Sequence, residues 1–221
     1  MIKFAVFDWN GTILSDVLAT VEASNHELAS IGRGPITLKQ MREAIDMPLS
    51  TYFANLGITT EELAKNSEMM ALAFHTYYEP RAARAHTRPG TRAALDELHR
   101  RGVRRFILSN HTMEGIYLQL ERLKLGDHFE AVLANDVLSA SYNMGKRDRL
   151  AEYLHMNKLA PGEGFIIGDT LEEIAIGRHF GLKTVAISGG HCSRERLAAG
   201  KPDVLIGSLH DLINAVEEIS S

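Results

Sequence analysis

Four polar residues lie at the ends of strand-like or helix-like segments of the sequence. Asp8 ends the apolar run KFAVF, Ser109 follows RRFIL, and Asp169 follows GFIIG. Lys146, in NMGKRDRL, comes just ahead of a helix-like stretch. Carboxylate, hydroxyl and ammonium groups are the ones that nucleophilic catalysis, metal binding and anion binding use. A single polar residue after a strand carries little information, but four of these types in this order indicate a reactive site.

The elements that would position these residues alternate along the chain from Arg88 onward. Apolar runs at 103–108, 131–134, 165–167, 184–187 and 204–206 are typical of buried strands, and residues 3–8 add another. Helix-like stretches lie near 91–101, 112–124, 147–158, 171–180, 193–199 and 208–219. Such alternation predicts an α/β fold, with a parallel sheet covered on both faces. The four polar residues would gather at its carboxyl edge, where open α/β sheets bind ligands.

Residues 15 to 86 have a different pattern and contain no convincing strand. Val17, Val21 and Leu28 recur at helical spacing, and capping boxes are expected at Thr37–Gln40 and at Thr59–Glu62. We therefore predict an all-helical cap at 15–86, inserted into a core that comprises 1–14 and 87–221. Because the insertion begins just behind Asp8, it could lie over the carboxyl edge of the sheet.

Composition narrows the class of protein. The 221 residues carry a formal net charge of −4, which gives no sign of nucleic-acid binding. With Cys192 as the single cysteine, an intrachain disulfide is excluded, and a reducing, cytoplasmic location is expected. No apolar run approaches the length of a membrane span, so no membrane partner is expected. Monomer and homodimer both remain open.

The polar sites and their neighbours resemble the motifs of the haloacid dehalogenase-like (HAD) hydrolase superfamily. FDWNGTI is similar to its first motif, FILSN to the second, the lysine of MGKRD to the third, and IIGDTLEEI to the fourth. The resemblance spans nearly the whole chain and is closest to phosphoglycolate-phosphatase-like members. It implies a Rossmann-like parallel sheet with a helical C1 cap, and a Mg²⁺-dependent phosphatase acting on a small phosphorylated metabolite.

The resemblance also assigns roles within the site. Asp8 would be the nucleophile that forms an aspartyl phosphate. Mg²⁺ would be held by Asp8, Asp169 and the backbone carbonyl of Asn10, because this ion prefers hard oxygen ligands and keeps several waters. Phosphate would be bound by Ser109, Asn110, Lys146 and the backbone N–H groups of the Asn10–Gly11 turn.

Glu173 aligns with the last acid of the fourth motif but is longer than the usual aspartate. It also stands three residues after Thr170, which is the spacing of a helix capping box. A metal-site role and a helix-capping role for Glu173 therefore remain open. The adjacent Glu172 is expected to point elsewhere on the helix.

Asn10 replaces the aspartate that serves the related phosphatases as general acid and base. An amide cannot exchange a proton at useful pH, and such catalysis is typically worth about 10²–10⁴-fold, so slow hydrolysis is expected. Another group could supply the proton, and His26, Asp46 and His111 are candidates. Alternatively, the chain is a phosphotransferase, or a non-hydrolytic protein that binds a phosphate ligand and regulates another process.

Two features of the expected cap bear on the substrate. The segment AIDMPLSTYF is either a substrate-facing loop or an ordinary cap turn, and Arg42 could either meet an anionic substrate or point to solvent. Phosphonate cleavage would need a cap lysine, and neither Lys39 nor Lys65 has a distinctive context. The GDT motif argues against a metal-free dehalogenase.

Overall fold

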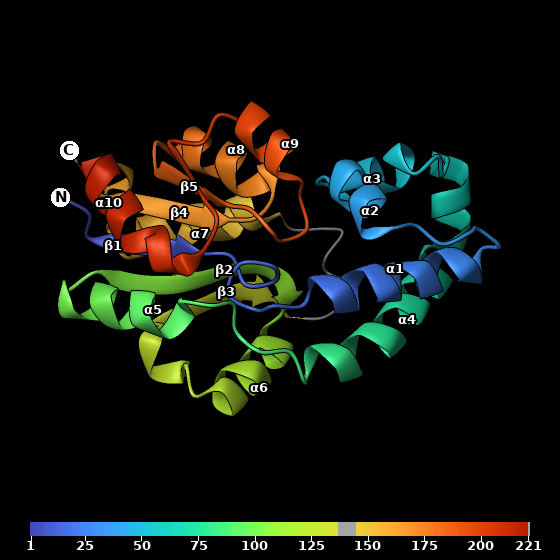
Figure 1. Cartoon of the computed structure of the whole chain (residues 1–221), viewed down its shortest axis with the longest axis horizontal. Helices are drawn as coiled ribbons and strands as arrows, with labels where there is room; N and C mark the ends of the chain where they lie inside the picture. Colours follow the sequence, from blue (N-terminus) through green and yellow to red (C-terminus); the bar gives the residue numbers. More distant parts are fainter. Residues whose placement is uncertain (137–144, 221) are drawn as a thin grey trace.

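The computed structural model describes residues 1–136 and 145–220 and is built on one six-stranded parallel sheet (Figure 1). Each strand pairs in parallel with its neighbours, in the order β3-β2-β1-β4-β5-β6. The strands are β1 Phe4–Phe7, β2 Arg104–Thr112, β3 Ala131–Asn135, β4 Gly164–Gly168, β5 Lys183–Ile187 and β6 Val204–Ile206. The predicted α/β class with a parallel sheet is confirmed.

Helices cover both faces of the sheet, as the continuous apolar strands require. One face packs against α5 (Thr91–Arg100), α6 (Met113–Leu123) and α10 (Leu212–Ser220), in a core that includes Phe7, Leu95 and Ile107. The other face packs against α7 (Lys146–Met156) and α8 (Leu171–Phe180), in a core that includes Phe4 and Ile166. Because both faces are buried, side chains at every position of β1 are buried.

The strand order places β1 at the centre, between β2 and β4. From β1 the chain builds outward through β2 to β3 and then returns to the other side of β1 for β4. Such a reversal leaves a crevice at the carboxyl ends of the central strands, which is the usual ligand site of open α/β sheets. Asp8 directly follows β1, and Asp169 directly follows β4.

Four helices between β1 and α5 form a separate group beside the sheet, on the right in Figure 1. They are α1 Val17–Ser30, α2 Leu38–Ala44, α3 Leu49–Asn55 and α4 Thr60–Ala82. The expected capping boxes are present, with Thr37 capping α2 through Gln40 and Thr59 capping α4 through Glu62. Long helices α1 and α4 pack side by side and connect this group to the sheet.

A few expected boundaries differ from the structure. The second strand was expected to end at Leu108 but continues to Thr112, with a register irregularity against β3. The stretch near 208–219 divides into a short 3₁₀ turn, Leu209–Asp211, and α10. Helix α9 (Arg194–Ala199) lies where one was expected.

Asn143 and Met144, which precede Lys146 in the third motif, lie outside the described residues. In the described part of the chain, no helix combines the length and apolarity of a membrane span.

Candidate active site

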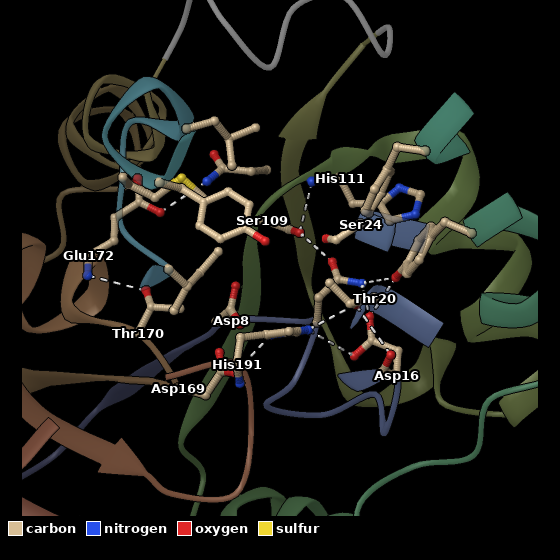
Figure 2. A pocket seen from close by; sticks show the side chains of 18 of the residues that line it. Asp8, Asp16, Thr20, Ser24, Ser109, His111, Asp169, Thr170, Glu172 and His191 are labelled. Atoms are coloured by element: carbon tan, nitrogen blue, oxygen red, sulfur yellow. Dashed lines mark hydrogen bonds and ion pairs between the residues drawn. The ribbon is translucent and has the colours of Figure 1, made fainter. Parts of the chain in front are cut away.

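The four polar residues singled out in the sequence meet at one cavity of about 220 Å³. Asp8 and Asp169 follow β1 and β4, Ser109 lies in β2, and Lys146 is the first residue of α7. Figure 2 shows Asp8, Ser109 and Asp169 converging on this pocket, whose other wall comes from α1, α3 and α4. The sheet topology, rather than sequence proximity, brings them together.

Lys146 is the cation at the centre of this cluster. Its ammonium nitrogen lies 2.6 Å from Asp8 Oδ1 and 2.5 Å from Glu173 Oε1, and its side chain is nearly inaccessible to solvent. Burial lowers the pKa of Lys146, but Asp8, Glu173 and Glu172 outweigh that effect and raise it well above its usual range. The lysine is therefore held charged beside Asp8.

Asp8 and Asp169 lie close enough to share a hydroxyl donor. Thr12 Oγ1 lies 3.0 Å from Asp8 Oδ2 and 3.4 Å from Asp169 Oδ1. Burial raises the pKa of Asp8 well above its usual range; the carboxylates of Glu173 and Asp169 add to the rise, and Lys146 opposes it. The site thus concentrates negative charge at one point, and further positive charge would favour the ionised form of Asp8.

Asp169 pairs with His191, which follows β5. The His191 backbone N–H donates to Asp169 Oδ2 over 2.5 Å, and the ring Nδ1 lies 2.9 Å from the same oxygen. Burial lowers the pKa of His191, but Asp169 and Asp16 raise it more, to about 9. Gly11 and Gly190 both pass so close to Asp169 that a Cβ on either would collide with its carboxylate.

Asn10 is held by a carboxylate and a phenol. Its Nδ2 donates to Asp16 Oδ2 over 2.9 Å and lies 2.6 Å from the hydroxyl oxygen of Tyr78, which itself donates to Asp16 Oδ2 over 2.5 Å. Ser109 Oγ lies 3.5 Å from Asn10 Oδ1. Tyr78 belongs to α4 and Asp16 precedes α1, so this network couples the first motif to both helices.

The backbone of the first motif is shaped by the same aspartate. Gly11 adopts a left-handed conformation, with φ 73°, and its N–H donates to Asp16 Oδ1 over 2.7 Å. This N–H is therefore engaged inside the protein, so phosphate binding at Gly11 stays a prediction. Asn110 lines the cavity, and its Nδ2 donates to Glu172 Oε2 over 3.0 Å.

Glu173 makes both a capping box and an ion pair. Its Oε2 accepts hydrogen bonds from the Thr170 hydroxyl at 2.6 Å and the Thr170 backbone N–H at 3.3 Å, while Oε1 pairs with Lys146. The helix-capping expectation is confirmed, and a metal-binding role for Glu173 stays a prediction. The expectation for Glu172 was wrong, because it lies 3.6 Å from Lys146 and lines the cavity. Its long side chain reaches the lysine from the adjacent helix position.

Of the three candidates for a replacement proton donor, one lines the cavity and two do not. His111 lines the cavity, and its buried Nε2 has no hydrogen-bond partner among residues 1–136 and 145–220. His26 instead stacks on Tyr77, and Asp46 pairs with Arg196, so neither lines the cavity.

Of Arg42 and the AIDMPLSTYF segment, only the segment lines the cavity among the described residues. Arg42 donates to the carbonyl oxygens of Gly189 and Gly190, which ties the cap to the core and does not place the guanidinium in the cavity. The AIDMPLSTYF segment does contribute cavity-lining side chains, among them Met47 and Tyr52.

Asp16, Tyr78 and His191 were not among the expected site residues. Asp16 directly precedes α1, where a polar residue is ordinary at the start of a helix. Tyr78 lies in a helix where a buried aromatic residue is ordinary. A signal existed for His191, since SGGH follows the fifth core strand at the same edge as the other site residues.

The donor set fits the Mg²⁺ that the first and fourth motifs imply. Asp8 and Asp169 are buried carboxylates joined through one threonine, and the backbone carbonyl of Asn10 accepts no hydrogen bond from the described residues. No three His, Cys, Asp or Glu side chains within residues 1–136 and 145–220 could hold an ion together. Two carboxylates and a carbonyl are nevertheless sufficient for Mg²⁺, which keeps several waters.

The cavity at the carboxyl edge of a parallel sheet, the two buried carboxylates and the helical insertion after β1 are typical of α/β enzymes that bind ligands at a switch point. The family model of haloacid dehalogenase-like hydrolases matches residues 5–187, so the chain belongs to that family. A phosphoglycolate phosphatase of Photobacterium profundum is 25% identical over 98% of this chain and 96% of its own. One of Pseudomonas fluorescens is 24% identical over 96% of this chain and 78% of its own.

Solved structures agree with the fold. A predicted phosphatase from Clostridium acetobutylicum superposes with a TM-score of 0.82 at 18% identity, over 99% of both chains. A haloacid dehalogenase-like hydrolase from Streptococcus pneumoniae gives 0.80 at 19% identity, over 97% of this chain and 98% of its own. The expected family and its phosphoglycolate-phosphatase-like character are confirmed.

Proposed function

We propose that the chain is a Mg²⁺-dependent phosphomonoester hydrolase that acts on a small phosphorylated metabolite through an aspartyl phosphate. The observation that carries the proposal is the buried Asp8 carboxylate, with Lys146 at 2.6 Å and Asp169 reached through Thr12. The names of the phosphoglycolate phosphatase relatives support phosphomonoesters as the substrate class.

The residues divide the reaction between them. An Asp8 oxygen attacks phosphorus as the bond to the leaving alcohol breaks, and water then cleaves the aspartyl phosphate to release phosphate. Ser109 and Lys146 lie where they can bind the phosphoryl oxygens, and Lys146 also balances the charge of Asp8. Mg²⁺, when bound by Asp8, Asp169 and the Asn10 carbonyl, would neutralise charge on the phosphoryl group.

Asn10 makes the proton transfers the weak part of this mechanism. Its amide holds Asp16 and Tyr78 but cannot give a proton to the leaving oxygen or take one from water. Without general acid–base help the rate is lower by about 10²–10⁴-fold, and the second step, which needs an activated water, suffers as well. Slow turnover follows from the proposal. With a good leaving group, which needs no general acid, the second step should be the slower one and the aspartyl phosphate should accumulate.

We also propose that residues 15–86 act as a cap over a core made of 1–14 and 87–221. Side chains of α1, α3 and α4 line the same cavity as Asp8 and Asp169. Tyr78 and Arg42 connect the cap to the first motif and to the Gly189–Gly190 turn. A substrate in this cavity would therefore contact both parts.

Phosphate release from a panel of phosphomonoesters tests the proposal, with and without Mg²⁺. The chain as given should release phosphate slowly in Mg²⁺, and the Asp8→Asn variant should release none. Intact mass should be checked in parallel, because deamidation of Asn10 would create the missing acid. Mg²⁺-independent release, or release by Asp8→Asn, would contradict the proposal.

A second candidate is a non-hydrolytic protein or phosphotransferase that uses the same pocket, and Asn10 is the observation that favours it. Tight Mg²⁺-dependent binding of a phosphate ester without phosphate release would support the binding protein. Faster loss of the aspartyl phosphate on addition of an acceptor alcohol would support the phosphotransferase.

A further inference from the structure

The cavity extends from the catalytic residues into the cap along one face of α1. Thr20, Ser24 and Glu27 stand at spacings of four and three residues, so they share a helical face, and all three line the cavity. Thr20 and Ser24 are shown in the same pocket as Asp8 in Figure 2. At 1.5 Å of rise per residue, Glu27 lies about 10 Å beyond Thr20 along the helix.

The far end of this cavity contains two polar groups that the protein satisfies poorly. The buried hydroxyl of Tyr52 makes no well-formed hydrogen bond with the residues that the structure describes, although the Ser24 hydroxyl interacts with it. Glu27 is only 5% exposed, and no hydrogen bond or ion pair with those residues offsets the burial of its carboxyl group. Buried polar groups are normally satisfied, so this pair of groups indicates a missing ligand.

The surroundings of Glu27 and Tyr52 favour one charge on that ligand. Phe53 and Phe74 also line this cavity, and aromatic faces attract cations. Burial raises the pKa of Glu27 to about 8. Burial also raises the pKa of Tyr52 to about 12; the Ser24 hydroxyl opposes this rise, and Glu27 adds to it. A bound cation would pair with the Glu27 carboxylate, whereas an anion would be repelled by it.

The same cavity offers little to an anionic leaving group. Among the described residues that line it, Lys146 is the one lysine or arginine, and it is already engaged by Asp8 and Glu173. The lining histidines are His75, His111 and His191, and His191 is held by Asp169. The undescribed stretch 137–144, VLSASYNM, contains no lysine, arginine or histidine.

We propose that this site selects phosphomonoesters whose alcohol carries a protonated amine, with the ammonium group bound between Glu27 and Tyr52. The inference rests on the proposed phosphatase function and gives its substrate class. The phosphate would lie at Asp8 and Lys146, and the carbon chain would follow the α1 face between the aromatic side chains. A short ester with a carboxylate, such as phosphoglycolate, would bring no cation to Glu27 and Tyr52.

Three esters of equal length test this selection on the full chain with Mg²⁺: 6-aminohexyl phosphate, 6-hydroxyhexyl phosphate and 6-(phosphonooxy)hexanoate. The expected order of kcat/KM is amine, then hydroxyl, then carboxylate. The amine should be favoured by about 10-fold or more, mainly through KM. Equal values, or a preference for the carboxylate ester, would overturn the inference.

Two variants locate the effect. Glu27→Gln should remove the advantage of the amine over the hydroxyl ester, while Glu22→Gln should retain it. Glu22 is the matched control, because it lies on α1 but pairs with Arg81 at an exposed surface. An amine advantage that survives Glu27→Gln would also overturn the inference.

A binding measurement separates this inference from the proposed function. Calorimetry should show 6-aminohexanol binding to the chain more tightly than to Glu27→Gln, whether or not any ester is hydrolysed. Binding without phosphate release from any ester, including para-nitrophenyl phosphate, would overturn the phosphatase function and support the amine site. Hydrolysis of para-nitrophenyl phosphate without 6-aminohexanol binding would support the phosphatase and overturn the amine site.

Discussion

The two ends of the cavity treat their buried polar groups differently. At the sheet edge, Asp8 pairs with Lys146, and Asp169 pairs with His191. At the cap end, Glu27 and Tyr52 are as deeply buried, but among residues 1–136 and 145–220 no ion pair offsets the burial of Glu27 and no well-formed hydrogen bond satisfies the Tyr52 hydroxyl. Satisfied polar networks hold one geometry, whereas unsatisfied ones cost stability.

The difference indicates a division of labour. Fixed charges and hydrogen bonds at the sheet edge suit a reaction that demands precise positions for attack on phosphorus. Poorly satisfied groups at the cap end suit a part of the site that is completed by the substrate. The first motif, with Asn10, is tied to α4 through Asp16 and Tyr78.

Removal of the nucleophile should have the largest effect. Asp8→Asn keeps the size of the side chain but cannot form an aspartyl phosphate, so phosphate release should fall by about 10⁴-fold or more. Ligand binding at the cap end should survive, since Glu27 and Tyr52 are untouched. If 6-aminohexanol binding were lost with activity, the two ends would not be independent. Phosphate assay and calorimetry measure the two properties.

Asn10→Asp should have the next largest effect: it should raise activity and lower stability. It restores a general acid and base, so phosphate release should rise by about 10²-fold or more. The new carboxylate would face Asp16 where the amide now donates at 2.9 Å, so the free energy of unfolding should fall by about 1–3 kcal/mol. Adding Asp16→Asn should recover the stability. A single variant that is neither faster nor less stable would contradict this account of Asn10.

Glu27 should make stability depend on pH. Its folded pKa of about 8 lies above the unfolded value of 4.5, so its contribution is fully present below pH 4.5 and is lost as pH rises toward 8. The expected slope is about 1.4 kcal/mol per pH unit between pH 5 and 8. Denaturant unfolding of the chain and of Glu27→Gln gives this slope as their difference. Parallel stability curves for the two would show that Glu27 is ionised or solvated in the fold.

Two tyrosine variants give the smallest but most closely matched contrast. Tyr78→Phe removes a hydroxyl that bonds Asp16 and Asn10, so it should cost about 1–3 kcal/mol. Tyr52→Phe removes a hydroxyl that makes no well-formed hydrogen bond, so stability should stay the same or rise by about 1 kcal/mol. Urea denaturation measures both changes. If both variants lost the same free energy of unfolding, the proposed contrast between the two ends of the cavity would be wrong.

The fold followed from the sequence because its signals are local. Buried parallel strands appear as continuous apolar runs, and the capping boxes at Thr37 and Thr59 depend on residues three apart. The convergence of Asp8, Ser109, Lys146 and Asp169 also followed, since each stands beside a sheet element and parallel strands share one carboxyl edge. Their chemical roles stay predictions.

The hydrogen-bond and ion-pair partners of these residues could not be predicted from the sequence, because they depend on long-range contacts. Tyr78 reaches Asp16 from 62 positions away, and nothing local separates it from an ordinary core aromatic residue. Glu172 was misplaced because adjacent helix positions differ by about 100°, yet both flexible side chains reach Lys146. Glu27 looked like one of many helix glutamates until the cap placed it in a cavity.

Phosphorylation of Asp8 during turnover can be measured by intact mass after an acid quench. The chain is mixed with para-nitrophenyl phosphate and Mg²⁺, quenched at short times, and mapped by peptide mass spectrometry. We expect one added phosphoryl group on Asp8, accumulating because Asn10 cannot activate the water that removes it. Phosphate release with no phosphorylated Asp8 at any time, and unchanged release by Asp8→Asn, would contradict this expectation.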